Sequence, residues 1–144
     1  MVRDALAAAA REGWAELVPC DAAFDDWPLG ERAVGDVLQA WSRTGRRLTL
    51  LAREYDTVVR RHALFVRWRQ TWDHIVECRD CRSADPLDLP SAIWSPGWVL
   101  QRLDPVRSVG VTGAEPTRRL QLRARIDEWL RRSSPAFPAS VSGL

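Results

Sequence analysis

Residues 46–78, RRLTLLAREYDTVVRRHALFVRWRQTWDHIVEC, constrain the fold more than any other part of the sequence. The short apolar run at 48–52 is nearly continuous, which is typical of a strand that is covered on both faces. Apolar residues then recur at helical spacing over about 58–72, and Ile75 and Val76 resume an extended pattern. A strand, a helix and a second strand in this order predict a parallel, right-handed β-α-β crossover.

The segments on either side of this unit predict a mixed sheet of about five to six strands with helices on both faces. The expected helices span 2–12, 30–43 and 116–132, and the other expected strands span 14–20, 92–94, 98–103 and 106–111. A chain of 144 residues can bury a core large enough for one domain. We therefore expect a single α/β domain at 1–132, with an N-terminal helix at 1–13 and a mobile C-terminal tail at 133–144.

The composition excludes several classes of function. All 21 basic residues are arginine, they face 19 acidic residues, and the net charge is +2. The absence of lysine rules out Schiff-base chemistry and a phosphate-loop lysine. The small net charge gives no global field that would favour nucleic acid or a membrane. Three cysteines, no signal-peptide pattern and no long apolar run predict a soluble protein of the bacterial cytoplasm.

One group of residues has spacing typical of metal ligands. His74, Cys78 and Cys81 occur together in HIVECRDC, and Cys20 would lie near them if the first and third strands were neighbours. A cysteine pair of this kind is a usual half of a zinc site, but the second half is missing. Zinc binding is therefore an alternative to the simpler interpretation, in which the cysteines are buried thiols and the protein has no cofactor.

Few other residues fit a catalytic or cation-binding pattern. His62 falls on the apolar face of its helix, where a hydrogen-bonded core histidine is the expected role. Two histidines and no G-x-S-x-G motif leave little material for a nucleophilic triad. Asp25, Asp26 and Glu31 could offer oxygens to a cation, although acids at this place also interact with the positive end of a following helix.

Nucleic-acid binding is a second alternative. Arg67, Trp68 and Arg69 lie on one predicted helix with Arg60 and Arg61, so guanidinium groups and an indole could contact phosphate and stack on a base. The near balance of charge and the apolar setting of most tryptophans argue against this role.

The predicted order of elements over residues 15–132 resembles one half of the phospholipase D-like fold. That family carries H-x-K-x4-D on a strand, and the segment GWVLQRLD has the matching frame. Asp104 matches the family's aspartate, whereas Gly97 and Val99 stand in place of the histidine and the lysine, and GVTG at 110–113 stands where a glycine-serine stretch would follow. The resemblance implies a degenerate, non-catalytic member that pairs two copies. The ending IDEWLRRSSP is also similar to that of truncated bacterial relatives of this fold.

Open α/β sheets bind ligands at the carboxyl ends of their parallel strands. The candidate ligand-binding residues at these strand ends are Glu54, Tyr55, Asp56 and Arg79. Trp94 and Trp98 could form an aromatic wall, and Asp104, which matches the family's aspartate, completes the set. For the two tryptophans, we expect a role as buried anchors rather than a wall. The sequence thus predicts a non-enzymatic binding or protein-interaction module, whose partner is another protein or a second copy. A zinc-dependent enzyme and a nucleic-acid binder are the alternatives.

Overall fold

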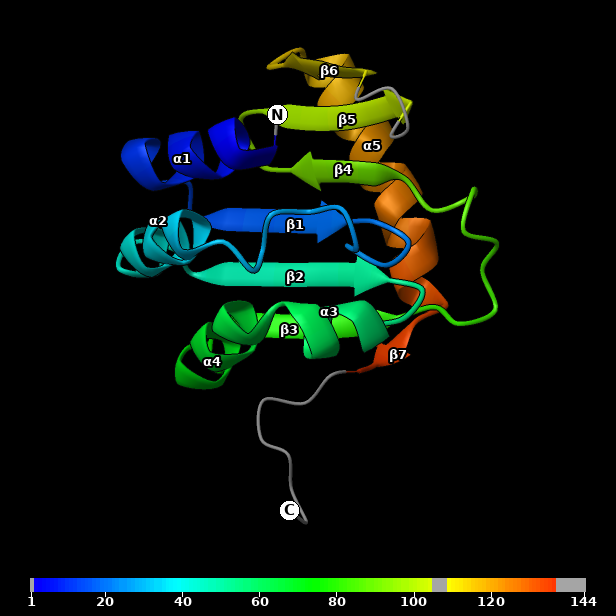
Figure 1. Cartoon of the computed structure of the whole chain (residues 1–144). Coiled ribbons are helices and arrows are strands. Elements are labelled where there is room, and N and C mark those ends of the chain that lie inside the picture. The colour runs from blue at the N-terminus through cyan, green and yellow to red at the C-terminus, as the bar shows by residue number, and fades with distance from the viewer. Residues whose placement is uncertain (1, 105–108, 137–144) are drawn as a thin grey trace.

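The computed structural model describes residues 2–104 and 109–136, which form one seven-stranded sheet with helices on both faces (Figure 1). Along the sheet the strands lie in the order β6-β5-β4-β1-β2-β3-β7. In chain order they are β1 (Glu16–Cys20), β2 (Arg47–Ala52), β3 (Val76–Asp80), β4 (Ser91–Trp94), β5 (Val99–Asp104), β6 (Val109–Gly113) and β7 (Ser134–Pro135). The predicted α/β fold class is confirmed.

The β-α-β unit predicted around β2 is present at the centre of the sheet. β2 pairs in parallel with β1 on one side and with β3 on the other, and Leu48 lies opposite Leu17 and Val76. From Leu48 to Ala52 every residue of β2 is buried. The run is continuously apolar apart from one threonine because both faces of β2 are covered.

The remaining strands are antiparallel to their neighbours. β4 pairs with β1, β5 with β4, and β6 with β5, so the three form one wing of the sheet. On the opposite edge, the two residues of β7 pair with the end of β3. Residues 105–108, where part of a predicted strand falls, lie outside the described residues.

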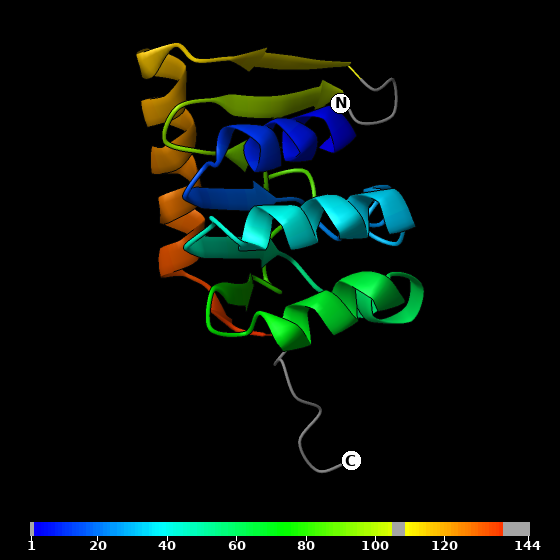
Figure 2. The same ribbon diagram turned by 90° about the vertical axis from the view of Figure 1, so that its left-hand side faces the viewer.

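The helices are distributed unequally between the two faces of the sheet (Figure 2). Four of them lie on one face: α1 (Val2–Glu12), α2 (Arg32–Ser42), α3 (Asp56–Arg61) and α4 (Ala63–Thr71). The other face carries α5 (Pro116–Arg131), which runs across the strands from the β6 side toward β7. Two cores result, a larger one beneath α1–α4 and a smaller one in which Leu122 and Ile126 of α5 pack against the strands.

The helix predicted over 58–72 is broken at His62. The backbone there leaves the helical region, with φ −118° and ψ 56°, and separates α3 from α4. His62 is buried, and its Nε2 lies 3.2 Å from the carbonyl oxygen of Phe24 in the loop after β1. This tertiary contact overrides the local helical pattern, which sequence periodicity alone does not reveal. His62 itself is the hydrogen-bonded core histidine that the sequence predicts.

The first residues of the predicted C-terminal tail are part of the sheet. Ser134 and Pro135 form β7, and the amide of Ala136 donates to the carbonyl of Cys78 at 2.9 Å. The segment thus adds an edge strand that the sequence did not indicate, because two residues carry no detectable alternation. Residues 137–144 lie outside the described residues.

Two glycines, one inside α2 and one just after it, provide a matched test of the packing in the larger core. Gly35 lies inside α2 with no atom near the place that a methyl group would take, so Gly35→Ala should raise the free energy of unfolding by about 1 kcal/mol. A methyl group at Gly45 would collide with the indole of Trp41, which is buried and donates to the carbonyl of Trp14, so Gly45→Ala should lower it by about 1–3 kcal/mol. Chemical denaturation of both variants measures the difference, and equal effects would contradict this packing.

Candidate ligand-binding surfaces

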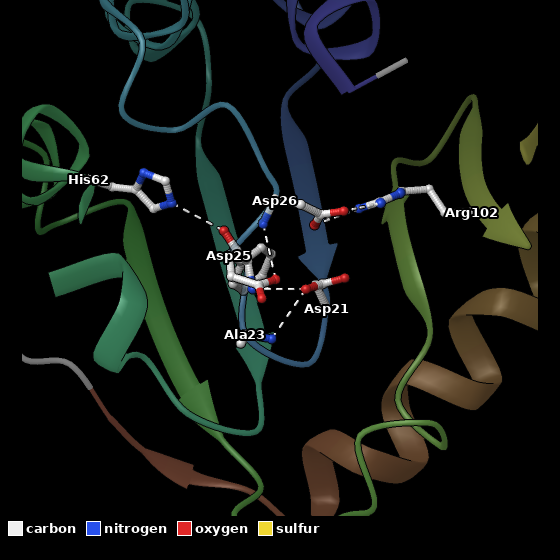
Figure 3. Close-up of polar contacts among 7 residues, drawn as sticks. Asp21, Ala23, Asp25, Asp26, His62 and Arg102 are labelled. Carbon is white, nitrogen blue, oxygen red and sulfur yellow. Dashed lines mark hydrogen bonds and ion pairs between the residues drawn. The ribbon is translucent and has the colours of Figure 1, made fainter. Parts of the chain in front are cut away.

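Three acidic side chains meet where β1 ends. Asp21, Asp25 and Asp26 each place a carboxylate oxygen within 4.8 Å of the others (Figure 3). Asp21 is buried and accepts hydrogen bonds from the amides of Ala23 and Phe24, at 3.2 and 2.8 Å. These bonds turn the chain sharply after β1.

An arginine from a distant strand neutralises one of these acids. Arg102 of β5 forms a bidentate ion pair with Asp26, in which Nη1 of Arg102 lies 3.1 Å from Oδ1 of Asp26. The Arg102 side chain is only 7% exposed, whereas that of Asp26 is 49% exposed. The hydrogen bond from Arg102 lowers the pKa of the Asp26 carboxyl below its ordinary value. With Asp21 holding backbone amides and Asp26 holding Arg102, this cluster acts mainly as an anchor for the loop.

Phe24 shows how tightly that loop is held. Its φ is +56°, in the left-handed region that a residue with a side chain rarely occupies. The residue is fully buried, its amide donates a hydrogen bond to the Asp21 carboxylate, and its carbonyl oxygen lies within hydrogen-bond distance of His62 Nε2. Contacts on both sides of the residue therefore stabilise the unusual backbone conformation.

The predicted ligand site after β2 is only partly assembled. Tyr55 and Asp56 line an open hollow of about 320 Å³, which Asp80 and Arg82 also border. The Tyr55 hydroxyl is already used, since it donates to the carbonyl of Arg79 at 2.8 Å, and burial raises its pKa well above the ordinary value. The hollow therefore mixes both signs of charge, and the hydroxyl of Tyr55 is not free to bind a ligand there.

The other predicted ligand residues do not converge on this hollow. Glu54 accepts a hydrogen bond from the amide of Asp56. Arg79 donates instead to the side chain and the carbonyl of Ser133, just after α5. The side chain of Asp104 lies outside the described part of the structure.

Trp94 and Trp98 do not form an aromatic wall. Trp94 packs on the α5 side of the sheet, donates to the carbonyl of Arg119 at 3.0 Å and lies under the guanidinium of Arg123. Trp98 belongs to the other core and packs against Trp14, with 5.4 Å between ring centroids. The two indoles are half-buried and pack against separate cores.

The proposed zinc ligands are not brought together in the described residues. Cys78 packs in the core beneath α1–α4, whereas Cys20 and Cys81 pack in the core beneath α5, and His74 is exposed beside Trp72. Cys78 and Cys81 are separated by three positions, an odd number, so an extended chain points them to opposite faces. The first and third strands are also not neighbours, because β2 lies between them.

The thiols have the character of core side chains. All three cysteines are buried, and burial raises the pKa of Cys78 to about 12 and that of Cys20 further. Raised values keep a thiol protonated, and the protonated form is a poor nucleophile and a poor metal ligand.

Sequence reasoning missed a polar groove beside α5. It has a volume of about 240 Å³ and lies between β5 and the first turns of the helix. Its lining residues are Gln101, Glu115, Thr117, Arg118, Gln121, Leu122 and Arg125. The excess of arginine in 116–132 could have indicated the groove, but the helical pattern cannot show which arginines remain without an acidic partner.

Neutralising Asp26 should reveal the strength of its ion pair. Asp26→Asn should lower the free energy of unfolding by about 1 kcal/mol at pH 7, since it removes a charge-assisted pair and leaves Arg102 buried. Because the folded-state pKa of Asp26 is lowered, the pair stabilises the protein above pH about 4 and loses its effect as the pH falls. The difference from wild type should therefore shrink toward pH 3 in denaturation measurements. Asp25→Asn is the control, because the native Asp25 carboxylate accepts its hydrogen bond from the backbone amide of Asp26.

Comparisons with known proteins give a fold and no family. No family model matches the sequence, and no curated protein matches it either. The structure is similar to TrmBL2, an archaeal chromatin protein with a novel mode of DNA binding, at a TM-score of 0.64 and 11% sequence identity. The alignment covers 94% of this chain and 51% of that chain, so the similarity extends over about half of TrmBL2. At this identity the likeness shows the fold alone.

Proposed function

We propose that this chain is a non-enzymatic nucleic-acid-binding module whose helix α5 contacts the phosphate backbone. We propose no catalytic role because the histidines and cysteines, the residues that could act as a nucleophile or its base, are engaged or buried. His62 is bonded to a backbone carbonyl, His74 lies against an indole, and the cysteines are buried. None of these groups is arranged as an activated nucleophile with its base.

The observation that carries the proposal is the pairing of the α5 arginines. Three of them donate to neutral oxygens: Arg118 to the side chain of Gln101 at 3.2 Å, Arg119 to the carbonyl of Ala114 at 3.1 Å, and Arg125 to the carbonyl of Asp88 at 2.9 Å. Their positive charges are thus held in place without an acidic partner in the described structure. The other arginines of this region differ, because Arg123 pairs with Glu16 and Asp127, and Arg131 and Arg132 both pair with Glu128.

Held guanidinium groups are suited to phosphate. Each presents several donors in a fixed plane that matches the oxygens of a phosphate group. Arg118 and Arg125 both border the groove beside α5. The helix contains five arginines and two acidic residues, so it is far more positive than the nearly balanced chain as a whole.

The helix that first suggested nucleic-acid binding is less suitable. Trp68 is buried, so its ring is closed to a base. The Arg69 side chain is 6% exposed and donates to the carbonyl of Val76 and to Asp73. Arg60, Arg61 and Arg67 stay exposed on α3 and α4, but without an available ring beside them. We place the proposed surface on α5, on the opposite face of the sheet, because two held arginines border one groove there.

The fold comparison supports this proposal only in general terms. TrmBL2 binds DNA, and about half of it shares this fold, but a shared fold does not transfer a function. Kinship with the phospholipase D-like fold also stays a proposal. Val99, which stands in place of that family's lysine, is fully buried, and this agrees with a non-catalytic role.

Fluorescence anisotropy with labelled single- and double-stranded oligonucleotides tests the proposal. Wild-type protein should bind both without strong sequence preference, more weakly as salt rises from about 50 to about 200 mM. Arg118→Gln combined with Arg125→Gln should weaken binding about tenfold or more and reduce the slope of log affinity against log salt by about two.

The matched control is Arg32→Gln combined with Arg43→Gln, which removes the same charge from exposed positions of α2 and the residue after it, on the other face. It should leave affinity and salt slope nearly unchanged. Equal losses in both double variants, or no binding by wild type at low salt, would contradict a specific surface on α5.

A further inference from the structure

The sheet has one free edge of useful length. β6 pairs with β5 along Val109–Gly113, and no described strand pairs with its other side (Figure 1). The backbone groups on that side are therefore available to another strand. The opposite edge differs, because β7 has only two residues and one of them is Pro135, which has no amide hydrogen to donate.

The chemistry of β6 offers little protection against pairing. Its sequence, VGVTG, contains no charged residue and no proline, the features by which monomeric proteins usually block an edge strand. Leu103 on the neighbouring β5 is 62% exposed, and Val111 of β6 is partly exposed. Gln101 pairs with Val111, and the register shifts between Arg102 and Asp104, so exposed Leu103 lies at an irregularity of the strand next to this edge.

We propose that a second copy of this chain docks on β6, strand against strand, around a two-fold axis at Val111. An antiparallel pair centred there sets Val111 opposite its own copy, Val109 opposite Gly113 and Gly110 opposite Thr112. No like charges meet in this register. Because β7 is too short to serve as the second edge, the contact uses the same surface on both copies and closes as a dimer rather than growing into a filament.

The dimer has a consequence for the face that carries α5. That helix begins three residues after β6 ends, so its first turns lie near the proposed axis (Figure 2). Pairing would place the Arg118 and Arg125 grooves of two copies on one continuous sheet face. The proposed dimer contact does not depend on nucleic-acid binding, because it involves only the edge strand β6. A five-residue edge is a small interface, so we expect micromolar affinity.

Cysteine cross-linking tests the register directly. Opposed residues of an antiparallel pair have Cα atoms about 4.5–5.5 Å apart, which suits a disulfide. Val111→Cys should therefore form a covalent dimer when micromolar protein is incubated with oxidised glutathione. The native cysteines are buried and should not interfere. Leu120→Cys, on α5 and 72% exposed in the native residue, is the control for random collisions and should stay largely monomeric.

Sedimentation of the full chain gives a second measurement. Wild type should show a monomer–dimer equilibrium at micromolar concentration, and Val111→Lys should be monomeric, since two ammonium groups would face each other across the axis. Val59→Lys, which adds the same charge at an exposed site on α3, should dimerise like wild type. Monomeric wild type, equal cross-linking at positions 111 and 120, or an undiminished dimer in folded Val111→Lys would overturn the proposal. If Val111→Lys does not fold, the cross-linking comparison still decides.

Discussion

The burial of β2 on both faces is the constraint on which the rest of the structure depends. Its apolar residues can leave water only if strands pair on both sides and helices cover both faces. The connections from β1 to β2 and from β2 to β3 supply α2, α3 and α4 on one face. The chain must then return across the other face, and α5 does so after the antiparallel wing is complete.

This asymmetry of helices explains where the proposed binding surface lies. Four helices close one face and use its side chains for packing, and buried Trp68 and Arg69 illustrate this. Among the residues that the structure describes, a single helix covers the other face, and its flanks leave a groove in which arginines are held by neutral oxygens. A positive charge that is positioned but not neutralised can bind an anion with little reorganisation.

Local patterns predicted most elements correctly, whereas long-range contacts decided the details. The N-terminal helix ends as expected at Gly13, whose φ is +68°, and the last helix spans nearly the predicted residues. The break at His62 could not be predicted, since its partner Phe24 is 38 residues away. The pairing of Asp26 with Arg102 joins residues 76 apart in the chain, and Asp21 went unnoticed because it is a single acid after a strand.

The same limit applies to the candidate sites. Spacing grouped His74, Cys78 and Cys81, but alternation along an extended chain separates the two thiols onto opposite faces. Sequence also cannot distinguish a committed arginine such as Arg69 from an available one such as Arg118, because the difference lies in burial and in the partner.

The central claim is that ligand binding uses the face covered by α5. Amide chemical shifts of isotope-labelled protein, recorded while an oligonucleotide is added, test it most directly. The account predicts that the perturbed amides concentrate in residues 114–125 and in the part of β5 around Gln101. Perturbations concentrated in α1–α4, with those residues unaffected, would contradict it.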